Sequence, residues 1–147
     1  LLAGQAPFVL FKLRRVLYWG SADEHLDFTT VDDTAAFTAA AALDPGTPRF
    51  LRIAGDRCSA RQLAEAASEA TGRRFRLLRA GSLARLERLI RLTRALFPQR
   101  DTLYPAWQGM QYMRDMYSGR GALGPLDNDR YPGMRWISVA EFLAALR

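Results

Sequence analysis

The chain of 147 residues contains one cysteine, Cys58, and one histidine, His25. A single cysteine cannot close a disulfide within the chain, and this pair cannot supply the Cys/His ligand set of a structural zinc site. We therefore predict no metal site and a reducing, cytoplasmic setting. Apolar runs are also short. The Ala-rich stretch 35–43 is interrupted by Thr38 and falls below the roughly 18 residues that cross a bilayer, so we predict no membrane partner.

Lysine is almost absent, because Lys12 is the only lysine among the 21 Lys and Arg residues that give the chain a net charge of +6. An excess of arginine can indicate nucleic-acid binding. Four arginines recur at every third position of a predicted helix, namely Arg85, Arg88, Arg91 and Arg94. Successive members drift by about 60°, so they spread over half of the helix surface, and no aromatic residue interleaves with them. We predict a solvated face and no nucleic-acid partner.

Hydrophobic periodicity and capping residues divide the chain into alternating strands and helices. We predict strands at 16–19, 26–31, 50–54 and 75–78, and helices that end near residues 43, 71, 97, 118 and 143. Asp32 is the expected N-cap of the first helix, Ser82 caps the third, and Pro105 suits the first position of the fourth. Ser59 and Ser138 each begin a capping box that opens another helix.

This order of elements predicts an α/β fold with a short, mostly parallel sheet and flanking helices. Three or four short strands are few for a doubly wound sheet. We therefore expect further strands on the N-terminal side, outside this sequence.

Two motifs in the C-terminal third invite a ligand. Residues Gly119 to Gly124 follow the pattern G-x-G-x-x-G. The dinucleotide fingerprint requires a strand before this pattern and a helix after it, whereas here a predicted helix precedes and Pro125 follows. The acidic run Asp127 to Asp129 lacks the further oxygen ligand and the glycine of a calcium loop. We predict a glycine-rich loop and a turn, with no cofactor-binding or metal-binding residue in either.

The helix from about residue 105 to 118 is apolar on more than one side. Its Trp, Met and Tyr side chains cover over half of the circumference, which exceeds the roughly 100° that one packed face needs. The second side must therefore pack against a substrate pocket or a partner subunit, or the helix is buried core. Trp107, Tyr112 and Met116 are the candidate pocket residues, and we expect at least one to border a concave apolar surface.

Several segments together resemble the NmrA-like family of atypical short-chain dehydrogenases/reductases, which includes isoflavone-reductase-like proteins. The segment from Leu26 to Phe37 resembles a late strand-to-helix unit of that family, in which an acidic pair opens an Ala-rich helix. Residues 50–56 and the capped helix after them are similar to the next unit. The ending, residues 126–133 followed by the helix at Ser138, resembles the family's C-terminus. The resemblance covers nearly the whole chain from about Val16.

The resemblance implies a Rossmann-type NAD(P)-binding fold, of which residues 1–147 are the C-terminal part of a single domain, with a helical substrate lobe. The nucleotide-binding half, with its glycine loop, is then absent. Short-chain dehydrogenases use a Tyr-x-x-x-Lys pair, but Phe8 stands four residues before Lys12, so the pair is missing. No catalytic or cofactor-binding position of the family finds a match in this chain.

The function implied is the substrate-side portion of an NAD(P)H-dependent oxidoreductase acting on a small organic molecule. The alternative is a catalytically silent, NAD(P)-sensing regulator of the same fold. In either case NAD(P)H belongs to the full-length parent, and we expect this chain alone to bind no cofactor and to be inactive. A truncated sheet also exposes an edge strand, through which the chain is expected to self-associate.

Overall fold

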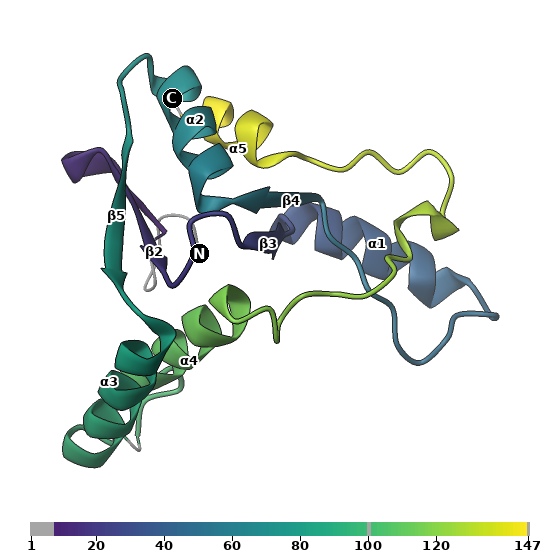
Figure 1. Ribbon diagram of the computed structural model, residues 1–147. Helices are drawn as coiled ribbons and strands as arrows, with labels where there is room; N and C mark the ends of the chain where they lie inside the picture. The colour runs from purple at the N-terminus through teal and green to yellow at the C-terminus, as the bar shows by residue number, and fades with distance from the viewer. Residues whose placement is uncertain (1–7, 100, 147) are drawn as a thin grey trace.

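The structure is a computed structural model that describes residues 8–99 and 101–146. Helices and short strands alternate along most of this range, as the sequence predicts (Figure 1). In chain order the elements are β1 Val9–Leu10, the 3₁₀ turn η1 Phe11–Leu13, β2 Arg15–Trp19, β3 His25–Phe28, α1 Val31–Leu43, β4 Asp56–Ser59, α2 Ala60–Thr71, β5 Arg76–Gly81, α3 Leu83–Leu96, α4 Ala106–Tyr117, the 3₁₀ turn η2 Asn128–Arg130, and α5 Val139–Ala145.

The larger sheet has the strand order β1-β2-β5, and its longer ladder, between β2 and β5, is parallel. The short β1 lies antiparallel on the other side of β2. Inward side chains of this sheet are fully buried, among them Val16 and, just before β1, Phe8. Helix α2 packs against β2 and β5, as expected for a helix that follows a strand in an α/β layer. The predicted α/β class is confirmed.

A second sheet pairs β3 with β4 in antiparallel register, with Leu26 opposite Cys58. The predicted strand at 50–54 is wrong, because those residues pair with no strand. The backbone groups of Arg52 and Ala54 are instead satisfied from the segment around η2. The Asp127 carboxylate accepts from the Arg52 amide at 2.7 Å, and the Asn128 side chain bonds both the amide and the carbonyl of Ala54, at 3.2 and 2.7 Å.

Helix α1 begins two residues earlier than predicted. Asp32 is not its N-cap. Thr30 has the extended conformation of a cap, and its hydroxyl accepts from the Asp33 amide at 3.0 Å. Since the strand-like pattern continues to Val31, periodicity alone placed the boundary too late. The helix ends at Leu43, before Asp44, as predicted.

Helices α3 and α4 lie side by side and extend away from the sheets (Figure 1). Ser82 caps α3 through the Arg85 amide, which confirms that start. Pro105 is the N-cap of α4 and not its first helical residue, a shift of one position. Arg114 joins the two helices through an ion pair with Glu87 at 2.9 Å. Within the described residues, no helix is long and apolar enough to cross a membrane.

Candidate functional site

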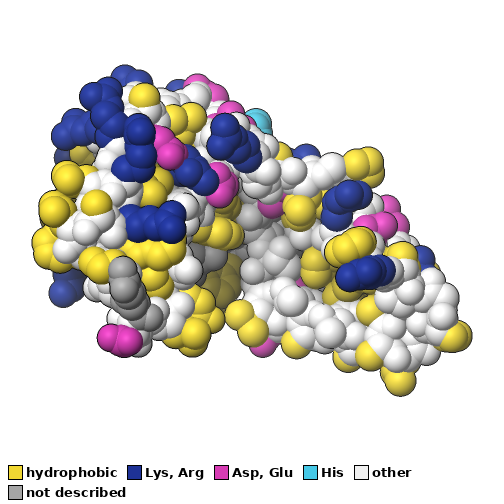
Figure 2. Space-filling view, turned by 90° about the horizontal axis from the view of Figure 1, so that it is seen from below, with side chains coloured by type: hydrophobic (Ala, Val, Ile, Leu, Met, Phe, Trp, Pro, Cys, Tyr) yellow, Lys and Arg dark blue, Asp and Glu magenta, His cyan; other side chains and the backbone are white. Residues whose placement is uncertain are grey.

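A cavity of about 670 Å³ lies between α4, β3 and the start of α5. This volume falls in the range of roughly 300 to 1,000 Å³ that is typical of small-molecule sites. Figure 2 shows the molecule hollowed between its two main parts, with Lys and Arg side chains gathered mainly to one side. The lining of the cavity combines mainly apolar, aromatic and hydroxyl side chains: His25, Leu26, Asp27, Phe28, Thr29, Thr30, Val31, Ile53, Tyr112, Asp115, Met116, Gly121, Ala122, Leu123, Ile137, Ser138, Val139 and Phe142.

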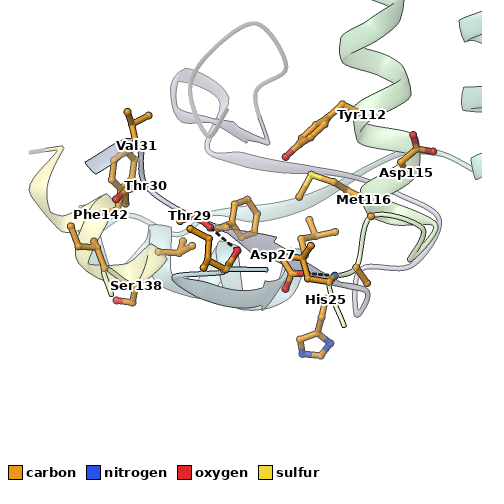
Figure 3. A pocket seen from close by; sticks show the side chains of 18 residues that line it. His25, Asp27, Thr29, Thr30, Val31, Tyr112, Asp115, Met116, Ser138 and Phe142 are labelled. Carbon is orange, nitrogen blue, oxygen red and sulfur yellow. Dashed lines mark hydrogen bonds between the residues drawn. The ribbon is translucent and has the colours of Figure 1, made fainter. Parts of the chain in front are cut away.

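Tyr112 and Met116 form the α4 side of the cavity. They lie four residues apart, so they occupy one face of the helix. Met116 is buried, whereas Tyr112 is 44% exposed. The Tyr112 hydroxyl extends toward the cavity (Figure 3), and it forms no hydrogen bond with any described residue. Partial burial of the ring raises the pKa of Tyr112, so the phenol stays protonated and can donate a hydrogen bond.

The β3 side of the cavity is fixed by Asp27. Its carboxylate accepts from Arg57 Nε at 2.6 Å and from the Leu123 amide at 2.8 Å, and Arg57 also donates to the Leu123 carbonyl. Burial alone would raise the pKa of Asp27. The Arg57 hydrogen bond, the Leu123 amide and the positive charge outweigh burial, so the pKa is lowered. Asp27 is therefore an anchored anion that holds the loop 121–123 against β3.

The α5 side is held by two carboxylates that bind backbone amides. Asp33 is buried and accepts from the Ile137 amide at 3.1 Å, and Asp56 accepts from the Val139 amide at 2.8 Å. Ser138 and Glu141 complete the predicted capping box. The start of α5 is thereby fixed against the beginnings of α1 and β4, and Phe142 on the next turn faces the cavity (Figure 3).

Trp107 lies apart from Tyr112 and Met116. Its indole N–H donates to the Pro98 carbonyl at 3.2 Å, and its ring lies 5.1 Å from the Arg94 guanidinium carbon, a cation–π contact. Trp107 lines a separate, smaller hollow of about 400 Å³ at the start of α4. The structure thus brings two of the three candidate pocket residues together. The other arginines of the α3 series are exposed, as expected for a solvated face.

The glycine-rich loop after α4 offers no phosphate cradle. Every backbone N–H from Ser118 to Leu123 donates to an acceptor within the protein, the last of them to Asp27. Gly119 has a φ of +73° and follows the end of α4, so it closes a helix and does not open one. The residues present therefore do not fit a dinucleotide.

Other nucleophile and metal arrangements also lack support. Burial, with the negative charge of Asp56 as a smaller cause, raises the pKa of Cys58 to about 12, so this thiol is not a thiolate at neutral pH. His25 is exposed. In the part of the chain that the structure describes, no group of three His, Cys, Asp or Glu side chains is arranged to hold a metal ion.

Phe28, Phe142 and Asp27 are residues of the cavity that we did not predict from the sequence. Phe28 was visible only as one apolar position of a strand, and Phe142 as one of a short C-terminal helix. Asp27 carries a possible signal, because it is a carboxylate inside an alternating strand pattern. Its partners, Arg57 and Leu123, are distant in sequence, so no local pattern reveals the contact.

The fold is shared with reductases of known structure. A binary complex of leucoanthocyanidin reductase with NADPH from Vitis vinifera superposes with a TM-score of 0.69 at 13% identity, over 90% of this chain and 46% of that chain. An isoflavone reductase superposes with a TM-score of 0.66 at 17% identity, over 90% of this chain and 43% of that one. The chain therefore spans less than half the length of the solved structures it matches. In sequence, no protein-family model and no curated protein matches it.

Proposed function

We propose that this chain is the C-terminal, substrate-side portion of an NmrA-like, atypical short-chain reductase that uses NAD(P)H to reduce a small organic molecule. The observation that carries the proposal is the superposition of 90% of the chain on less than half of reductase structures. The matching structures include two binary complexes of leucoanthocyanidin reductase with NADPH. The proposal assigns residues 1–147 to the second part of one NAD(P)-binding domain.

In this proposal the cofactor and the catalytic groups belong to a preceding half. The support is that the backbone amides of residues 119–123 already donate to acceptors within the protein, so a dinucleotide needs another phosphate-binding loop. This chain contributes the cavity, with Tyr112 and Met116 as substrate contacts on α4. The same residues and the apolar side chains opposite exclude water from a bound molecule. Trp107 faces the separate hollow.

The regulatory alternative, a silent NAD(P) sensor, has no observation in its favour, because the similar solved structures are reductases. The proposal includes a cytoplasmic setting, which the single, buried Cys58 supports. Self-association through an open sheet edge also stays a prediction. Strand β5 is last in the order β1-β2-β5, and its Arg76 and Arg79 are charged residues of the kind that discourage edge pairing.

Calorimetry with NAD(P)H tests whether cofactor binding requires the half of the parent that precedes this chain. The 147-residue chain should show no saturable binding below millimolar concentration, while the longer parent should bind and oxidise NAD(P)H with an organic acceptor. Saturable binding by the chain alone would contradict the proposal. A parent that binds the nucleotide tightly but transfers no hydride to any acceptor would favour the sensor.

In the parent, Tyr112→Ala should raise KM for the organic substrate while leaving the Kd for NAD(P)H within about twofold. Tyr104→Ala is the matched control, because Tyr104 is 68% exposed and lies outside the cavity lining. A change in nucleotide affinity that equals the change in KM would remove Tyr112 from the substrate site.

A further inference from the structure

The cavity has a charge unlike that of the chain as a whole. The sequence has 21 Lys and Arg residues against 15 Asp and Glu. None of the described lining residues is Lys or Arg, whereas two of them, Asp27 and Asp115, are carboxylates. His25 also belongs to the lining, but its imidazole points away from the side occupied by Tyr112 and Met116 (Figure 3). The described part of this basic protein thus forms a cavity that no Lys or Arg lines.

The two carboxylates differ in how fully their charge is matched. Asp27 has its own guanidinium, from Arg57, and a backbone amide. Asp115 shares the Arg114 guanidinium with Glu87, at 2.8 and 2.9 Å respectively. One positive charge therefore faces two negative ones, and the Asp115 side chain is 40% exposed. Asp115 therefore keeps part of its negative charge, although its carboxylate points away from Tyr112 and Met116 (Figure 3).

The hydroxyl groups of the lining differ in the same way. Thr29, Thr30 and Ser138 each use their hydroxyl in a hydrogen bond within the protein. Tyr112 forms none with a described residue, and its hydroxyl extends into the cavity beside the apolar surface of Met116 (Figure 3). This phenol can donate a hydrogen bond to, or accept one from, one polar group of a bound molecule.

We propose that this cavity selects neutral or cationic organic molecules over anionic ones, and that the Tyr112 hydroxyl bonds one alcohol, carbonyl or amine group of a ligand with an apolar body. The inference deepens the proposed function and rests on it where it treats the cavity as the substrate site. A carboxylate, sulfate or phosphate would lose its hydration in a cavity whose described lining offers no Lys or Arg as a partner. An apolar ring gains contact with Met116 and Phe142.

Three probes with one ring system test the charge preference: 2-naphthalenemethanol, 2-naphthylmethylammonium and 2-naphthoate. Their binding to the 147-residue chain is measured by NMR titration without nucleotide. We expect the alcohol and the ammonium ion to bind, and naphthoate to bind at least tenfold more weakly. Equal or tighter binding of naphthoate overturns the inference, and so does the absence of binding by all three.

Two variants locate the preference in the cavity. Tyr112→Phe should weaken the binding of 2-naphthalenemethanol by about 3- to 10-fold, the effect of one neutral hydrogen bond. The affinity for 2-methylnaphthalene, which has no polar group, should change by less than about twofold. Asp115→Asn should reduce the difference in affinity between 2-naphthalenemethanol and 2-naphthoate. Tyr104→Phe removes a hydroxyl outside the cavity and should change nothing. The inference is contradicted if Tyr112→Phe lowers the affinity for all ligands equally, or if Asp115→Asn leaves the difference in affinity between alcohol and naphthoate unchanged.

The failure of this inference and that of the proposed function are distinguishable. The probe preference is measured without NAD(P)H, so it is independent of any redox step. If the parent transfers no hydride but the preference holds, the reductase proposal fails and the charge selectivity stands. If the parent is a reductase that accepts anionic substrates as readily as neutral ones, the selectivity fails alone.

Discussion

Two helices of nearly equal length, α1 and α2, are attached to the molecule in different ways. Helix α2 buries an apolar stripe against the larger sheet and α5, formed by Ala60, Leu63, Ala64, Ala67 and Ala70. Helix α1 buries only Asp33 and Phe37, and it extends away from the larger sheet (Figure 1). The small residues of α2 let its neighbours approach closely, whereas α1 relies on a few directional contacts.

The contacts around the far end of α1 are mostly polar. Asp44 accepts from the Arg130 guanidinium at 2.7 Å and from the Tyr131 hydroxyl at 3.1 Å. The Tyr131 ring also packs on Phe37, with centroids 5.1 Å apart. Hydrogen bonds of this kind each contribute little net free energy, while apolar burial adds up with area. The comparison therefore predicts a cooperative α2 core and a region around α1 that opens locally at lower free energy.

The largest effect is expected in the α2 core. Leu63 is fully buried, so Leu63→Ala removes apolar contacts and leaves a cavity, which should lower the free energy of unfolding by about 2 to 5 kcal/mol. The control is Leu43→Ala at the end of α1, where the side chain is 86% exposed and the change should be near zero. Urea denaturation measures both. Similar losses at the two positions would remove the contrast between the helices.

A smaller effect is expected where the segment around η2 meets residues 52–54. Asn128→Ala removes both side-chain hydrogen bonds to Ala54 and should lower stability by about 1 to 3 kcal/mol, because a part-buried amide and carbonyl lose their partner. Amide exchange at Ala54 should accelerate before that of Leu63. Asp129→Ala is the matched control, since Asp129 is exposed and forms no hydrogen bond with a described residue. Uniform acceleration across the chain would mean that this contact is not local.

The N-cap of α1 gives an effect of about 1 kcal/mol. Thr30→Ala removes the hydroxyl that accepts from the Asp33 amide and should lower the free energy of unfolding by that amount. Asp32→Ala removes only a favourable charge in the first turn and should lower the free energy of unfolding by roughly 0.3 kcal/mol. Thermal denaturation of the two variants ranks them. A larger loss of stability in Asp32→Ala than in Thr30→Ala would support Asp32 as the N-cap, as predicted from the sequence.

Features set by local sequence were predicted well. The capping boxes at Ser59 and Ser138 occur as expected, because their partners lie three residues away. Helix α2 ends at Thr71, as predicted, and Gly72 follows it in the left-handed conformation with a φ of +65°. The α/β order also follows from local periodicity. Each of these depends on residues within one or two turns of one another.

Features that depend on distant residues were predicted less well. Residues 50–54 have a strand-like pattern, but their backbone partners are side chains about 75 positions later in the chain. The width of the apolar α4 surface predicted Tyr112 and Met116 as candidate pocket residues. The opposite side of the cavity combines Phe28 of β3 with Phe142 of α5, which are far apart in the sequence. Sequence periodicity shows that a face needs a partner but not which element supplies it.

The smallest expected effect is the pH dependence of the contact between Asp44 and Arg130. The Arg130 hydrogen bond, followed by the Gly46 amide, lowers the pKa of the Asp44 carboxyl below its ordinary value. A carboxyl with a lowered pKa in the folded state stabilises that state above the ordinary pKa of about 3.9, and this contribution is lost as the pH falls through the folded value. The contribution is small because the pair is exposed and screened by salt. NMR titration of the Asp44 carboxyl from pH 6 to 2 measures the shift.

The control for this titration is Arg130→Gln, which removes the cation and should return the Asp44 pKa toward its ordinary value. The exchange protection factor of the Gly46 amide, which donates to Asp44 at 2.8 Å, should fall in the same pH range. The methyl signals of Leu63 should not follow that step, because α2 is held by apolar contacts that do not titrate. A Leu63 response at the Asp44 midpoint would show that the two helices unfold as one unit, and the contrast between them would be lost.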